Sequence, residues 1–138
     1  MPNETNRFHR WQTIAIDQLT YALNLFLTMT IAALGYWFSL LKDEHFVPGS
    51  TGRCTMLFSL LALAVSALCG LACVVNRLHD FRGTAKRAKG VEDAPTRDEL
   101  RGLGRVTWAL FYVHLGFLTL GIGLLAVTLL LKFGSKLQ

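Results

Sequence analysis

Charged side chains are scarce in this sequence. Asp, Glu, Lys and Arg make up 17% of its 138 residues, whereas a soluble domain usually carries about 25%. The scarcity is concentrated in three runs that contain none of these four residue types, at positions 18–41, 54–76 and 106–131. Each run is longer than the roughly 20 apolar residues with which a helix crosses the hydrocarbon core of a bilayer. We therefore expect a single-domain, all-α integral membrane protein with three transmembrane helices over about these residues.

Residues that would support catalysis are also lacking. The sequence contains no phosphate-binding glycine loop and no catalytic pairing of a nucleophile with a base or of two carboxylates. The three cysteines, Cys54, Cys69 and Cys73, all lie in the second run, so they cannot build a disulfide framework outside the membrane. We expect Cys69 and Cys73 to serve packing rather than metal binding, because thiolates are costly in lipid. The sequence thus predicts no enzyme activity, no metal and no cofactor.

The basic residues predict the orientation in the membrane. Residues 76–105 hold eight of the fourteen Lys and Arg residues, and with three spans this segment lies on the same side as the N-terminus. That side then carries ten basic residues against four on the other. Because basic residues accumulate on the cytoplasmic side, we expect the N-terminus inside and the C-terminus outside. The pattern lacks the basic–aromatic platform of a nucleic-acid-binding protein, so the expected partner is the lipid bilayer and not nucleic acid.

Aromatic residues mark the expected ends of two spans. Tyr36 and Trp37 lie at the outer end of the first span, and Trp108 and Tyr112 begin the third span at the inner level. Trp and Tyr are enriched at the headgroup level of a membrane. We expect these four side chains to form an outer and an inner aromatic belt.

The second and third helices are expected to continue beyond the membrane. The apolar spacing of Val74, Leu78, Phe81, Ala85 and Ala88 extends the helical pattern of the second run. Gly90 is suited to cap that helix, and residues 96–99 match a capping box that would start the next one. We therefore expect an antiparallel helical hairpin in the cytoplasm over about residues 77–105, in which Leu100 and Leu103 meet Phe81 and Leu78. Basic residues that would dock a cytosolic partner on it are Arg77, Arg82, Lys86, Arg87 and Lys89.

The first span carries a polar stripe. Its members share one helix face by their spacing of four, three and four: Asp17, Tyr21, Asn24 and Thr28. An amide in lipid is unfavourable, so the face around Asn24 should meet protein or water. The stripe therefore indicates either a hydrogen bond to a neighbouring helix or the lining of a pore or ion path.

The second span carries small residues at four-residue spacing. Ala62, Ser66 and Gly70 form a seam of the kind that lets two helix backbones approach closely. Ser59, Ser66 and Cys73 repeat at seven residues on an overlapping face. We expect this seam to be a helix-packing surface and, specifically, the interface of a homo-oligomer.

The third span repeats small or polar residues every seven positions, and these share a face: Thr107, His114, Gly121 and Thr128. His114 lies at nearly the depth of Asn24, so the two side chains are placed to meet. The imidazole is then either buried and bonded to Asn24 or to a backbone carbonyl, or it gates protons or ions along a pore face. Haem ligation is disfavoured, because the other three histidines lie outside the spans.

The segment NRLHDFRGTA, with AKRAK following, resembles the juxtamembrane part of small bacterial membrane proteins encoded beside anti-phage systems, the predicted SLATT effectors. The resemblance implies a bacterial inner-membrane protein with a role in antiviral defence. The outer side, on which the basic residues place the C-terminus, would then be the periplasm. The stripes themselves predict a protein that self-associates and forms a pore or perturbs the membrane. One alternative is a non-catalytic accessory or scaffold subunit whose basic hairpin docks a cytosolic partner. Another is a haem- or quinone-linked redox subunit.

Overall fold

The computed structural model describes residues 3–44, 49–88, 90 and 97–133, and these form three long α-helices. They are α1 (Asn3–Lys42), α2 (Ser50–Ala88) and α3 (Arg97–Phe133). With 40, 39 and 37 residues, each is about 55–60 Å long at 1.5 Å per residue, roughly twice the thickness of a hydrocarbon core. Each helix contains a segment long and apolar enough to cross a membrane. The predicted all-α architecture with three candidate spans is confirmed.

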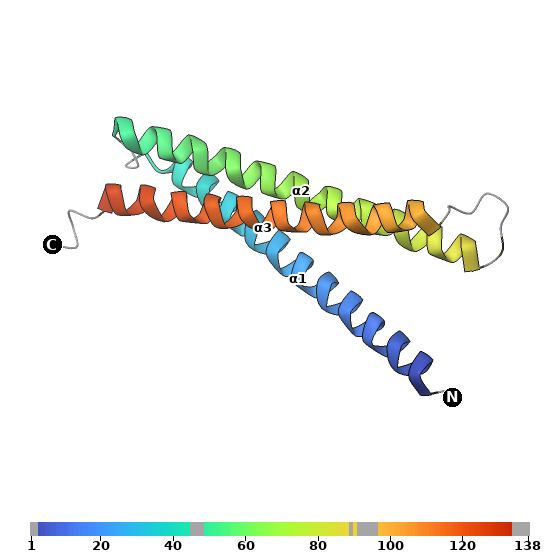
Figure 1. The fold of residues 1–138 in the computed structure, drawn as a ribbon. Helices are drawn as coiled ribbons and strands as arrows, with labels where there is room; N and C mark the ends of the chain where they lie inside the picture. The colour runs from blue at the N-terminus through green and yellow to red at the C-terminus, as the bar shows by residue number, and fades with distance from the viewer. Residues whose placement is uncertain (1–2, 45–48, 89, 91–96, 134–138) are drawn as a thin grey trace.

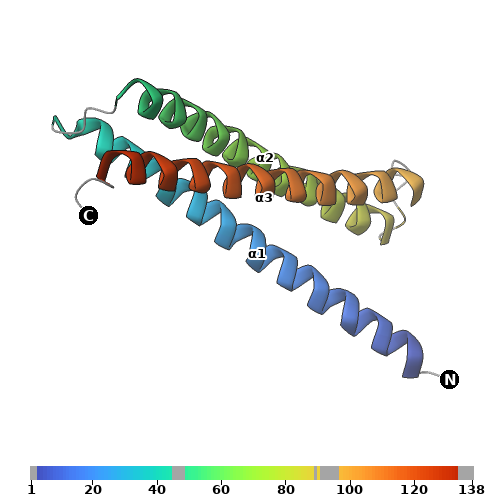
Figure 2. The same ribbon diagram turned by 60° about the vertical axis from the view of Figure 1, so that its left-hand side comes forward.

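The helices are arranged as a close antiparallel pair with a third helix crossing it. α2 and α3 lie side by side along their length. α1 packs near the end of the pair where α2 begins and α3 ends, and it diverges from the pair toward its own N-terminus (Figures 1 and 2). The first turns of α1 lie at the end of the molecule where α2 ends and α3 begins (Figure 1). The predicted extension of the second and third helices into an antiparallel hairpin is thus present.

Each helix buries a row of side chains at seven-residue spacing, and these rows run through the core. α1 buries Leu23, Thr30 and Trp37, α2 buries Ser59, Ser66 and Cys73, and α3 buries Thr107, His114, Gly121 and Thr128. A seven-residue repeat keeps the same face turned toward a partner helix over many turns. Two apolar clusters lie along these rows, one formed by Trp37, Leu63 and Leu118 and the other by Leu23, Cys73 and Phe111.

Trp37 belongs to this core and not to an aromatic belt, so its predicted headgroup position is wrong. Its side chain is fully buried, and its indole Nε1 donates a hydrogen bond of 2.9 Å to Ser59 Oγ. The seven-residue step from Leu23 and Thr30 turns it inward, whereas the neighbouring Tyr36 stays exposed. At the other end, Trp108 and Tyr112 are exposed as predicted.

The hairpin extension follows the buried rows rather than the apolar spacing used to predict it. Gly90 has φ 66° and its N–H bonds the Arg87 carbonyl at 3.1 Å, so it caps α2 as expected. α3 begins at Arg97, while Thr96 of the predicted capping box lies outside the described residues. Leu78 and Phe81 are half-exposed and line a groove beside α1. The side chain of Leu100 lies outside the described residues, so the expected contact of Leu78 and Phe81 with Leu100 and Leu103 stays a prediction. At this level Asn76 contacts α3, because its amide donates to the Leu103 carbonyl at 2.9 Å.

Candidate functional site

A ladder of side-chain hydrogen bonds joins α2 to α3 inside the membrane segment. Three α2 side chains spaced by seven residues donate to backbone carbonyls of α3: Ser59 to Gly121 at 2.8 Å, Ser66 to His114 at 3.0 Å, and Cys73 to Thr107 at 3.4 Å. Each step of seven residues along α2 matches a step of seven back along α3, because the helices are antiparallel. Short donors such as Ser and Cys reach a neighbouring backbone only when the helices are close. The ladder therefore fixes both the register and the separation of this pair.

His114 lies at the middle rung of the ladder and is fully buried. Its Nδ1 lies 2.7 Å from the carbonyl oxygen of Ser66 and 2.9 Å from Ser66 Oγ. A carbonyl oxygen can only accept, so Nδ1 carries the proton in this arrangement. Nε2 is buried and has no hydrogen-bond partner among the described residues. Of the roles predicted for His114, the structure shows the buried imidazole bonded to a backbone carbonyl.

Glycines make room for this packing at two positions. A Cβ on Gly70 would lie 3.1 Å from His114 Cε1 and 3.0 Å from Leu27 Cδ1, so the bare backbone admits both side chains. A Cβ on Gly121 would lie 2.7 Å from the Leu63 side chain and 3.3 Å from its backbone nitrogen. The backbone of α3 at Gly121 thus lies close to α2 at Leu63.

The small-residue seam packs within the chain, which corrects its predicted role. Ala62, Ser66 and Gly70 are all buried, so they are helix-packing residues as expected. Within the chain, Ser66 bonds His114 on α3, and Gly70 packs against His114 and Leu27 of α1. Ser66 and Gly70 are thus used in contacts within one chain and not in the homo-oligomer interface predicted for them.

The polar row of α3 is likewise internal, so its prediction as a pore-facing row is wrong. The Thr107 hydroxyl accepts a bond of 2.8 Å from the Asn76 amide and donates to the Leu103 carbonyl at 3.0 Å. The Thr128 hydroxyl lies 3.0 Å from that of Thr55 on α2. With His114 between them, these polar groups lie inside the α2–α3 pair and not on its surface.

The polar stripe of α1 faces outward, and the expected meeting of Asn24 with His114 does not occur. Asp17, Tyr21, Asn24 and Thr28 are all exposed, Tyr21 to 73%. The face that α1 buries, through Leu23, Thr30 and Trp37, lies roughly opposite this stripe at 100° per residue. Thr28 satisfies its hydroxyl on the Asn24 carbonyl at 2.8 Å. The side chains of Asp17, Tyr21 and Asn24 form no hydrogen bond with the described residues.

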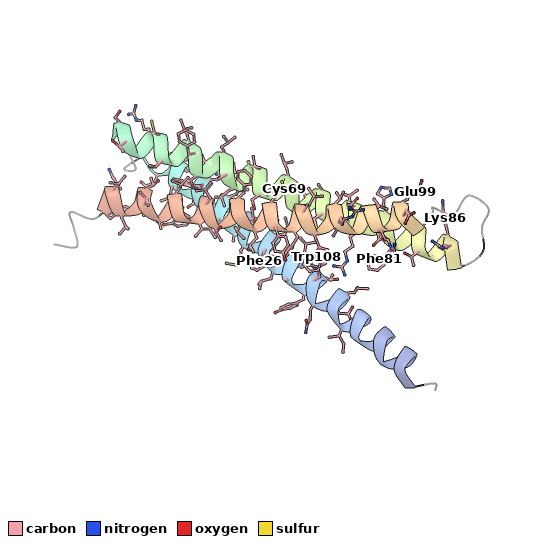
Figure 3. All side chains as sticks on the ribbon, in the orientation of Figure 1. Phe26, Cys69, Phe81, Lys86, Glu99 and Trp108 are labelled. Carbon is pink, nitrogen blue, oxygen red and sulfur yellow. The ribbon has the colours of Figure 1, made fainter. Side chains whose placement is uncertain are left out.

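Arg77 is turned toward α1, unlike the other basic residues predicted to dock a partner. It is only 8% exposed, its Nη2 donates to the backbone carbonyl of Ile16, and its guanidinium carbon lies 5.4 Å from the centre of the Phe81 ring. Its role as a cytosolic docking residue is therefore wrong. Arg82, Lys86 and Arg87 are exposed, with Lys86 near the end of the hairpin (Figure 3). Lys89 lies outside the described residues.

Aromatic side chains fill the angle where α1 leaves the pair. The rings of Phe26 on α1 and Phe111 on α3 have centroids 6.1 Å apart, and Trp108 meets Phe111 edge to face at 6.0 Å (Figure 3). Sequence reasoning missed this cluster, the buried row of α1 and the inward turn of Arg77. The seven-residue spacing of Leu23, Thr30 and Trp37 was the available signal for the row. We find no signal in the sequence for the direction of Arg77.

Comparison with protein-family models, with curated proteins and with solved structures finds no match to this chain. Within the described residues, no group of three His, Cys, Asp or Glu side chains is placed to hold a metal ion. Two features of the chain bear on its function: the outward polar stripe of α1 and the buried guanidinium of Arg77.

Proposed function

We propose that this chain is a non-enzymatic membrane protein that self-associates through the polar stripe of α1 and opens a polar path across the membrane when assembled. The supporting observation is the exposure of Asn24, within a segment that is a candidate span, on the face opposite the packed side of α1. A polar side chain exposed to lipid is costly and usually faces protein or water. A second copy of α1 would supply a protein neighbour, and several copies together would enclose water.

The path is assigned to α1 because the other polar rows are already used. Ser66 and His114 bond each other inside the α2–α3 pair, and three helices from one chain enclose no water-filled channel. Several copies placed with their α1 stripes together would line a path with the following groups: Asp17, Tyr21, Asn24 and Thr28. The α2–α3 pairs would then form the outer, lipid-facing ring.

We further propose that the protein lies in a bacterial inner membrane with its N-terminus and the 77–105 hairpin in the cytoplasm. The ten basic residues on that side support this orientation. A role in anti-phage defence, by depolarising the membrane of an infected cell, rests on the resemblance of residues 76–90 to the predicted SLATT effectors. The defence role is separable from self-association and is tested separately, by phage challenge.

The direct test combines oligomeric mass with membrane leakage. Wild-type protein and Asn24→Leu are reconstituted in nanodiscs for mass measurement and in liposomes for ion leakage. Asn24→Leu removes the polar group while keeping an exposed side chain of similar size, so we expect a smaller assembly and loss of leakage. Met29→Leu is the matched control, because Met29 is exposed on α1 outside the stripe. It should assemble and leak like wild type.

A monomeric wild-type protein would contradict self-association. A wild-type oligomer that does not leak would contradict the path and retain only assembly. If Asn24→Leu assembles and leaks as wild type does, the stripe is not the interface.

The second candidate function is that of an accessory subunit that docks a cytosolic protein on the hairpin. Its support is the exposure of Arg82, Lys86 and Arg87 on the last turns of α2. Their replacement together by Gln would abolish a docking function while leaving oligomeric mass and leakage unchanged. That pattern separates it from assembly through α1.

A further inference from the structure

Arg77 is a buried cation without a counter-charge in the described part of the chain. Its Nη1 is inaccessible to solvent and has no hydrogen-bond partner there. Among the described residues its only hydrogen bond is the one from Nη2 to the Ile16 carbonyl, and no described carboxylate forms an ion pair with it. Burying a charge is costly unless an opposite charge accompanies it. The geometry therefore calls for an anion beyond the described part of the chain.

A groove of about 220 Å³ opens beside Arg77, between α1 and α2. Its walls are mostly apolar, with two polar side chains from α1. The lining residues besides Arg77 are Leu23, Val74, Leu78 and Phe81, together with Thr20 and Asn24. A groove with apolar walls, one cation and a few neutral polar groups suits an amphipathic anion better than a small soluble anion.

The position of the groove along α2 indicates which amphipathic anion. The charge-free run ends at Asn76, so Arg77 stands at the level where α2 leaves the hydrocarbon core. Lipid phosphates lie at that level, and basic pockets between transmembrane helices bind anionic headgroups. Val74 lies one turn deeper than Leu78, which places the apolar walls on the side from which an acyl chain would come.

We propose that this groove binds one anionic phospholipid, with its phosphate on the Arg77 guanidinium and an acyl chain along Val74 and Leu78. A guanidinium presents paired N–H donors that match phosphate oxygens. The lipid would bridge α1 and α2 at the end where α1 diverges from the pair (Figure 1). The proposal does not depend on self-association, because both walls of the groove come from one chain.

The test is lipid retention measured by native mass spectrometry after reconstitution with equal amounts of phosphatidylglycerol and phosphatidylcholine. Wild type should retain one phosphatidylglycerol per chain. Arg77→Gln keeps a donor for the Ile16 carbonyl but removes the charge, and should lower the preference for phosphatidylglycerol about five-fold. Arg82→Gln, an exposed arginine on the same helix, is the matched control and should keep the wild-type preference.

A second variant tests the groove without touching the cation. Leu78 is half-exposed, so Leu78→Trp fills the slot without burying new bulk in the core. It should reduce lipid retention even if Arg77→Gln fails to fold. Soluble glycerol phosphate, which has the phosphate but no acyl chain, should not displace the lipid at equal concentration.

Three outcomes would overturn the proposal. The first is equal retention by wild type, Arg77→Gln and Leu78→Trp. The second is displacement by glycerol phosphate, which would indicate a site for a free anion. The third is a smaller oligomer in Asp17→Asn with no lipid retained by wild type, which would make the carboxylate of a second copy the counter-charge.

Discussion

Ser66 and His114 exchange hydrogen bonds across the α2–α3 contact, each donating from its side chain to the backbone carbonyl of the other. The Ser66 hydroxyl reaches the His114 carbonyl at 3.0 Å, and His114 Nδ1 reaches the Ser66 carbonyl at 2.7 Å. The exchange is possible because Gly70, one turn along α2, leaves room for the imidazole. A reciprocal pair of this kind holds two antiparallel helices in one register.

Removing the side-chain donor of Ser66 or of His114 should destabilise the contact of α2 with α3 modestly. We expect Ser66→Ala and His114→Leu each to lower the free energy of unfolding by about 0.5–2 kcal/mol, since hydrogen bonds between membrane helices average about 0.6. The double variant should lose less unfolding free energy than the sum of the two single variants, because both substitutions disrupt the same contact. Thermal unfolding in detergent measures this. Thr119→Ala is the control, since that hydroxyl is exposed and bonds only its own helix; strict additivity would disprove the coupling.

Because Gly121 contacts Leu63, we expect alanine substitutions at Gly121 and at Gly123 on the same helix to change stability by different amounts. Gly121→Ala places a methyl group 2.7 Å from the Leu63 side chain, so the helices must separate at a cost of about 1–3 kcal/mol. Gly123→Ala meets nothing within 4 Å and should be neutral or slightly stabilising, because Ala favours helix. The melting temperatures of the two variants should therefore shift in opposite directions or by clearly unequal amounts. Equal shifts would contradict the close approach.

Trp37 links all three helices through one chain of donors. Its indole donates to Ser59 Oγ at 2.9 Å, and Ser59 donates to the Gly121 carbonyl at 2.8 Å. Trp37→Phe should keep most of the packing and cost about 1 kcal/mol, while Trp37→Ala should cost about 3–5. Trp108 is exposed, so Trp108→Phe is the control and should be nearly neutral. Equal sensitivity of the two positions would argue against a buried Trp37.

The orientation can be tested with a reporter that is active only in the periplasm. Fused after Gln138 it should be active, and fused at Gly90 it should be inactive, because basic residues hold the hairpin side in the cytoplasm. Expression of both fusions is checked by immunoblot. Activity at Gly90 with none after Gln138 would invert the proposed topology.

The polar stripe of α1 shows where sequence reasoning reached its limit. Its spacing correctly placed Asp17, Tyr21, Asn24 and Thr28 on one face. It could not decide whether that face meets α3 or the outside, since an amide at membrane depth is equally explained by a neighbour in the same chain or in another. The buried row of Leu23, Thr30 and Trp37 decides it by occupying the opposite face.

The three helices, their candidate spans and the hairpin of α2 and α3 could be predicted from the sequence, because length, apolarity and capping act along the chain. The side chains that share a face could also be predicted, since helical spacing is local. Which face meets which neighbour is known only from the folded chain. That choice rests on contacts between distant residues, namely Gly121 against Leu63, Ser66 with His114, and Trp37 with Ser59. The rotation of each helix about its axis depends on these contacts together, and no local pattern contains them.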